Sequence, residues 1–178
     1  MKSGKVGQVM SKYSIFFVLL VMILISMLLN ENFLSTRNIT NIAVQLSVAT
    51  ILAYGEMVLI VSGLLDLSSG AVLALAGVLS VSAYKSTGNL ALAVAVSIGV
   101  AVAFNMINAL FVANFAMPAF IVTLATQMAA RGLALLYTKG QNILQIGDYA
   151  KLGQGSIGPI PIPVIFMIAA TIVIWYIM

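Results

Sequence analysis

The most polar stretch within the apolar part of this sequence is Gly63-Leu64-Leu65-Asp66-Leu67-Ser68-Ser69-Gly70, where Asp66 is one of only four acidic residues. A carboxylate and hydroxyls ahead of an apolar run can accept the free backbone N–H groups of a helix start. A carboxylate inside a membrane span is also a candidate ion or proton site. We therefore predict a joint between two membrane helices at residues 63–70. It is either a short capped loop or a helix broken within the membrane that lines a transport path.

Further polar side chains recur at helical spacing and are candidates for the lining of such a path. Glu56 is either a structural hydrogen-bond partner of a neighbouring helix or a path-lining group, because a carboxylate inside a span usually faces protein or water. Asn105 and Asn108 lie on one stripe and predict either interhelical hydrogen bonds or contacts with a solute. The candidates for the lining are Gln45, Glu56, Asn105, Asn108, Thr123 and Gln127.

Arg131 shares a helical face with Thr123 and Gln127. Counting about 1.5 Å per residue along alternating spans places Arg131 and Glu56 on opposite sides of the bilayer, so no direct ion pair is expected. We predict that Arg131 has a structural role or reaches towards the outer face, a head group or a loop.

Composition determines the class of protein. Hydrophobic residues make up 62% of the 178 residues and charged residues 7%, whereas soluble domains carry about 25% charged residues. There is no His or Cys, which removes most metal-site, nucleophilic and acid–base chemistry and makes a membrane enzyme the weakest hypothesis. No cofactor or metal is expected, and the net charge of +4 does not indicate nucleic-acid binding. Three lysines within residues 1–12 predict a cytoplasmic N-terminal tail under the positive-inside rule.

The elements that position these residues are predicted to be about six apolar helices in an all-α, polytopic transmembrane bundle. Residues 1–178 are read as one transmembrane domain, and a cleaved signal peptide is the competing interpretation of the first helix. The segment 71–84 is short for a crossing, which favours a broken helix, and 30–40 and 85–89 are predicted to be loops. The predicted helices are 13–29, 41–62, 71–84, 90–115, 118–138 and one from 164 onwards.

Two further patterns describe surfaces rather than chemistry. Residues 91, 95, 99 and 103 are all Ala or Gly, and this row predicts close approach of another helix. The polar segment 139–163 ends in alternating prolines, which predict an extended rod. This segment is either a docking surface outside the membrane or a plain connector.

Several separated motifs, in order, resemble the permease subunits of ribose-type ABC importers of bacteria. The resemblance covers nearly the whole chain from about residue 32. It departs locally, because Gly63-Leu64-Leu65 and Ser69 replace the usual residues around Asp66. The matching motifs are Asn32-Phe33-Leu34, Asn38-Ile39-Thr40-Asn41, Gly55, Asp66-Leu67-Ser68, Gly70, Asn108, Pro118 to Thr126, Ala130 to Ala134, Lys139-Gly140-Gln141 and Ile160 to Pro163.

The resemblance implies a permease of about twice this length, of which this chain is the N-terminal half. It implies import of a monosaccharide or related solute through the bacterial cell membrane by alternating access. The implied partners are a cytoplasmic ABC ATPase, an extracellular or periplasmic sugar-binding protein, a second permease chain and membrane lipids. The chain has no G-x-x-x-x-G-K-[ST] loop, so ATP hydrolysis is assigned to the separate subunit. The alternative is an ion-coupled carrier or channel that uses Glu56 and Asp66.

Overall fold

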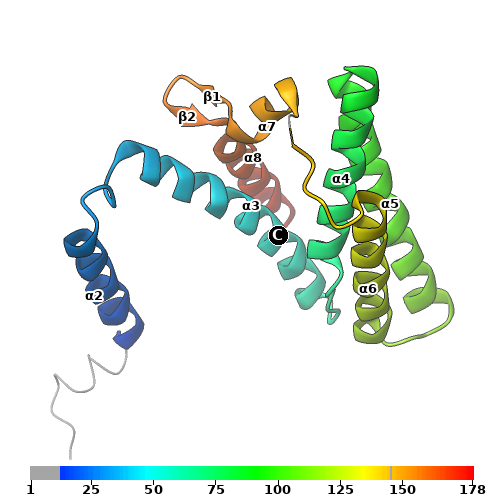
Figure 1. The fold of residues 1–178 in the computed structure, drawn as a ribbon. Coiled ribbons are helices and arrows are strands. Elements are labelled where there is room, and N and C mark those ends of the chain that lie inside the picture. Colours follow the sequence, from blue (N-terminus) through cyan, green and yellow to red (C-terminus); the bar gives the residue numbers. More distant parts are fainter. Residues whose placement is uncertain (1–12, 145) are drawn as a thin grey trace, which may run out of the picture. The chain divides into compact units, whose positions relative to one another are not determined.

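The computed structural model describes residues 13–144 and 146–178, and these fall into two compact units that divide between Gln45 and Leu46. The predicted cytoplasmic tail 1–12 lies outside the described residues. The structure is helical almost throughout, with seven α-helices in the described part and four of them long and apolar enough to cross a membrane. The all-α polytopic prediction is therefore confirmed (Figure 1).

The first unit contains helix α2 (Ser14–Leu29) and the start of α3 (Thr36–Val61). Asn38 secures the turn between them, because its side-chain amide donates to the carbonyl of Phe33 at 2.7 Å. The predicted loop 30–40 is therefore too long, since α3 begins at Thr36 and the loop keeps only residues 30–35. No residue of α2 is buried, as expected for a helix whose neighbours are lipid or other protein.

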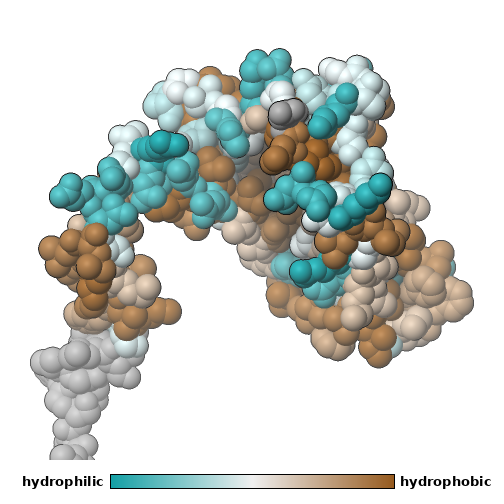
Figure 2. Space-filling view, in the orientation of Figure 1, coloured by the Kyte–Doolittle hydropathy of each residue, from teal (hydrophilic) through white to brown (hydrophobic). Residues whose placement is uncertain are grey.

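The second unit is built on three helices, α4 (Ser69–Thr87), α5 (Leu90–Asn114) and α6 (Ala119–Thr138). Helix α4 packs against both α5 and α6, and Val72 and Leu75 of α4 meet Ala130 and Ala134 of α6 in the core. The alanines let the helix backbones approach closely, which is how membrane helices gain packing energy. Outside this core, apolar side chains cover much of the surface around α5 and α6, while hydrophilic ones gather over the segment that follows α6 (Figure 2).

Helix α4 is longer than its apolar residues predicted. It has 19 residues rather than 14, and it includes part of the predicted turn 85–89. It ends where Gly88 takes a φ of 68°, a left-handed conformation that only glycine adopts without strain. The shortness of this helix therefore no longer supports a broken span.

The predicted extended rod at the end of segment 139–163 is wrong. The segment contains a 3₁₀ turn (Gly147–Tyr149), helix α7 (Ala150–Gln154) and a two-stranded hairpin of β1 (Ser156–Ile157) and β2 (Ile160–Pro161). Helix α8 (Ile162–Ile177) then begins with a proline in its first turn. A proline is tolerated there because the first N–H groups of a helix have no partner within the helix.

The segment after α6 is fixed to the helix bundle by Tyr149. Its hydroxyl lies 3.0 Å from Oγ of Ser80, which is fully buried and donates to the carbonyl of Ala93 at 2.7 Å. The ring of Tyr149 also packs against Tyr84, with ring centroids 5.8 Å apart. These contacts make the segment an ordered part of the second unit rather than a loose connector.

Candidate functional site

The predicted joint is an irregular segment of residues 62–68 between α3 and α4, in which the chain reverses direction (Figure 1). Gly63 has a φ of 77°, so the turn that ends α3 depends on a residue without a side chain. Asp66 Oδ1 accepts hydrogen bonds from the backbone N–H and the hydroxyl of Ser68, both at 2.6 Å. The carboxylate thus orders the turn before α4, whereas Ser68, at the N-cap position, makes no side-chain cap bond.

A buried polar network connects this joint to α5 and α6. Asn108 Nδ2 of α5 donates to Ser68 Oγ at 3.1 Å, and Asn108 Oδ1 accepts from Thr126 Oγ1 of α6 at 2.5 Å. Thr123 Oγ1 donates to the carbonyl of Leu65 at 3.3 Å. The side chains of Ser68, Asn108, Thr123 and Thr126 are all buried. Each buried polar side chain of the network has a hydrogen-bond partner, and fully bonded networks of this kind make a structure rigid and specific.

The network also gives the depth of the joint within the bundle. Asn108 lies six residues before the end of α5 at Asn114, and Thr126 lies seven residues after the start of α6 at Ala119. At 1.5 Å per residue, the joint contacts both helices roughly 10 Å inside their ends. Irregular backbone at that depth in a membrane occurs where it packs on protein or lines a cavity. The joint combines features of both predicted forms, because it is an interhelical loop that is inset into the bundle.

Helix α3 is joined to the start of α4 by a second carboxylate. Ser69 Oγ donates to Glu56 Oε1 at 2.5 Å. Glu56 is half-buried. In the described part of the chain the one ion pair joins Lys151 to Asp148 at 2.9 Å, far from the joint in sequence and fully on the surface.

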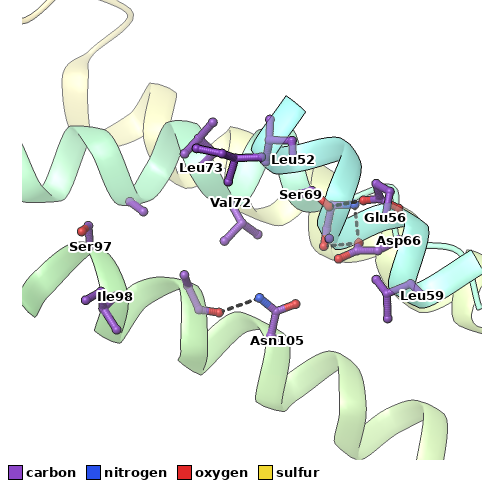
Figure 3. Close-up of a pocket in the computed structure, with 15 residues that line it drawn as sticks. Leu52, Glu56, Leu59, Asp66, Ser69, Val72, Leu73, Ser97, Ile98 and Asn105 are labelled. Atoms are coloured by element: carbon purple, nitrogen blue, oxygen red, sulfur yellow. Dashed lines mark hydrogen bonds between the residues drawn. The ribbon is translucent and has the colours of Figure 1, made fainter. Parts of the chain in front are cut away.

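Two cavities meet at this joint. The larger, of about 420 Å³, lies among α3, α4 and α5, and Glu56, Asp66, Ser69, Ser97 and Asn105 provide polar atoms in its lining (Figure 3). The smaller, of about 250 Å³, lies between the joint, α5 and α6. Leu59, Asp66 and Asn105 line both cavities. The two spaces therefore adjoin at a carboxylate and an amide, and hydroxyl-bearing solutes bind through such groups.

Most of the predicted site residues meet at this place. Asp66, Ser68, Ser69, Glu56 and Asn105 line the larger cavity, and Asn108 and Thr123 line the smaller one.

The remaining site residues lie elsewhere. Gln45 is exposed, belongs to the first unit and lines neither cavity, and the half-buried Gln127 also lines neither. Gly63 and Gly70 are exposed and flank the joint, and Arg131 is exposed on α6.

Sequence reasoning missed Thr126 as a site residue, and it placed Ser97 on a polar stripe with Asn105 without naming it as a lining residue. Thr126 lies between Thr123 and Gln127 along α6, but a lone hydroxyl on an apolar helix gives no signal of its own. Ser97 belongs to the polar stripe of Asn105 on α5, and the larger cavity shows that this stripe faces α3 and α4 (Figure 3).

The model of the branched-chain amino acid transport system / permease component family matches residues 38–178. The chain belongs to this family. Among curated relatives, the ribose import permease protein RbsC of Bacillus subtilis is 34% identical over 170 residues, covering 94% of this chain and 53% of that protein.

Permeases named for other sugars match as well. The D-allose transport system permease protein AlsC of Escherichia coli is 34% identical over 93% of this chain and 52% of its own length. The xylose transport system permease protein XylH of Haemophilus influenzae is 32% identical over 80% of this chain and 39% of its own length. The chain spans about half the length of these curated relatives. No solved structure matches it significantly.

Family membership and the four long apolar helices agree with the prediction of a multi-pass membrane protein. A membrane location also explains where the polar groups of the joint lie. Polar atoms are costly in lipid, and those of the joint either form hydrogen bonds within the protein or face a cavity. The family thus supplies a reason for a polar site in an apolar bundle.

Proposed function

We propose that this chain is the permease subunit of an ABC importer for a monosaccharide or a related small solute. The observation that carries the proposal is the pair of adjoining cavities that share Asp66 and Asn105 at an inset joint, in a chain whose curated relatives are named as ribose, allose and xylose permeases. The role of the chain would be to provide the path, without covalent chemistry of its own.

The proposed path runs through the two cavities and past Leu59, Asp66 and Asn105, which line both. Transport requires that the two cavities open in turn, so an element between them must move. The joint is the natural element, because Ser68 accepts a bond from Asn108 of α5 and the carbonyl of Leu65 accepts one from Thr123 of α6. Directly after the joint, Ser69 of α4 donates to Glu56 of α3. A shift of α3 or α4 would be transmitted directly to the lining of both cavities.

The proposed partners are a cytoplasmic ABC ATPase, an extracellular or periplasmic sugar-binding protein and a second permease chain. The ATPase would bias the equilibrium between inward-open and outward-open states by its own differential affinity for them. The binding protein would deliver the solute.

The test is uptake by the full-length permease reconstituted in liposomes with its ATPase and binding protein. The proposal predicts uptake of a labelled pentose or hexose that requires ATP and stops when the ATPase is inactivated. Uptake that survives the inactive ATPase and collapses with an ion gradient would instead support the ion-coupled carrier. One observation favours that alternative, because Glu56 and Asp66 face the same cavity.

A further inference from the structure

All the charged side chains that line the two cavities are acidic. Glu56 and Asp66 line the larger cavity and Asp66 also lines the smaller, and no Lys or Arg of residues 13–144 and 146–178 lines either. The acidic lining contrasts with the sequence as a whole, which has eight basic and only four acidic residues. Half of the carboxylates of the chain therefore face one small space.

The surroundings of both carboxylates suit a negative charge. Each accepts a hydroxyl hydrogen bond, Glu56 from Ser69 and Asp66 from Ser68, and an ionised carboxylate can only accept. Asp66 precedes the N-terminal end of α4, where the helix dipole favours negative charge, and Glu56 of α3 reaches the same end through its bond to Ser69. In the described part of the chain, the second oxygens, Glu56 Oε2 and Asp66 Oδ2, have no hydrogen-bond partner. The charge of each carboxylate is thus directed at the cavity rather than neutralised by protein.

We propose that Glu56 and Asp66 make the solute path reject anions, so that neutral polyhydroxyl solutes pass and their carboxylated or phosphorylated counterparts do not. The inference rests on the proposed function and adds a selectivity to the same site. A charge at the centre of a cavity of about 420 Å³ lies roughly 5 Å from its wall. At an effective dielectric constant of about 20, one carboxylate at that distance disfavours an anion on the order of a hundredfold. Access of solvent and salt lowers this to roughly tenfold per carboxylate.

The 178 residues contain no cysteine, so any cysteine in the remainder of the full-length permease is first replaced by serine. Single cysteines are then introduced by Asn105→Cys, which lines the larger cavity together with both carboxylates, and by Ser156→Cys, on the exposed strand β1 outside the apolar helices. Each is modified with a cationic and an anionic methanethiosulfonate reagent of similar size, and the ratio of the two rates reports the local potential. We expect the ratio at position 105 to favour the cationic reagent at least about tenfold more than at position 156.

Neutralisation by Glu56→Gln and Asp66→Asn provides the matched control, because both amides keep the oxygen that accepts from serine. In this double variant we expect the ratio at position 105 to fall to within about twofold of that at position 156. Ser97→Cys, eight residues or about 12 Å along α5, should show a smaller preference than position 105.

Equal ratios at positions 105 and 156, or a ratio at 105 that is unchanged in the double variant, would overturn the proposal. The result does not depend on transport, so its failure is separate from failure of the proposed function. A permease that imports a neutral sugar with ATP yet shows no preference between the two reagents would keep the function and lose the selectivity.

Discussion

Replacement of Asn108 by leucine should release the joint from α5 and α6. Asn108→Leu keeps a similar volume but removes the bonds to Ser68 Oγ at 3.1 Å and to Thr126 Oγ1 at 2.5 Å. Interhelical hydrogen bonds in membrane proteins contribute about 0.6 kcal/mol each on average and up to about 1.7 kcal/mol. Loss of two such bonds should lower the free energy of unfolding by about 1 to 3 kcal/mol. Part of the cost is offset because the Thr126 hydroxyl can bond to a carbonyl of its own helix instead.

The loss is measured by unfolding the full-length permease in mixed micelles with increasing SDS. Asn105→Leu is the matched control, because Asn105 lies on the same helix, is exposed and bonds only to the carbonyl of Ala101 one turn back. This control should change the free energy of unfolding by less than about 0.5 kcal/mol.

A second readout follows the joint itself. Loss of about 1 to 3 kcal/mol raises the population of a detached joint roughly 5- to 100-fold if the loss acts locally. In a full-length permease from which any other cysteine has been removed, a single thiol introduced by Leu67→Cys should then react faster by a similar factor in the Asn108→Leu background. Equal destabilisation by Asn108→Leu and Asn105→Leu, with no change in thiol reactivity, would refute the reasoning that Asn108 holds the joint.

Three other predictions test the surroundings of the site. Gly63→Ala should destabilise the full-length permease by about 1 kcal/mol in the same SDS titration, because the backbone at Gly63 has a φ of 77°. No neighbouring atom obstructs a methyl group at either Gly63 or Gly99, so Gly99→Ala, which lies in a helix, is the control and should not destabilise the protein. Ser80→Ala should cost about 1 to 2 kcal/mol and speed proteolysis after α6, because a fully buried hydroxyl loses its bonds to Ala93 and Tyr149. The hydrogen bond from Lys151 to Asp148 raises the pKa of Lys151 above its usual 10.5, so any stabilisation by this ion pair is complete below that pH and is lost only as the pH rises beyond it. Because both side chains are exposed, Asp148→Asn should leave the free energy of unfolding unchanged between about pH 6 and pH 9.

Sequence reasoning predicts the bounds of the helices better than it predicts which residues pack between them. Apolar runs gave α2, α5 and α6 to within one or two residues, because span length depends on composition alone. The extra residues of α4 were missed because Lys85, Ser86 and Thr87 are polar, yet a helix continues until a residue such as Gly88 stops it.

Which face of a helix packs inward was less predictable. The small-residue row of Ala91 and Gly99 predicts a helix contact, yet both are exposed in this unit and no atom lies within 4 Å of a methyl group built on Gly99. The core of the described unit instead uses Ala93, Ala130 and Ala134. Small residues are common on every face of these helices, so spacing alone does not select the one that packs.

The candidate site was predictable because polar residues are rare in the spans. Asp66, Glu56 and Asn105 attract attention in an apolar sequence, and the structure brings them to one cavity. Their partners are less evident, since Thr126 and Ser97 can satisfy their hydroxyls within a helix and need no polar neighbour. A pattern of spacing contains no information on which of these hydroxyls turns towards another helix.

The central claim is that the solute passes beside the joint, through the cavities that Asn105 lines. The most direct test measures ATP-dependent sugar uptake by the full-length Asn105→Cys permease before and after its thiol is modified with a bulky neutral maleimide. The account predicts that modification at position 105 reduces uptake to background, while the same modification of Ser156→Cys, on the exposed strand β1, leaves uptake intact. Uptake that continues unchanged with position 105 fully modified would contradict it.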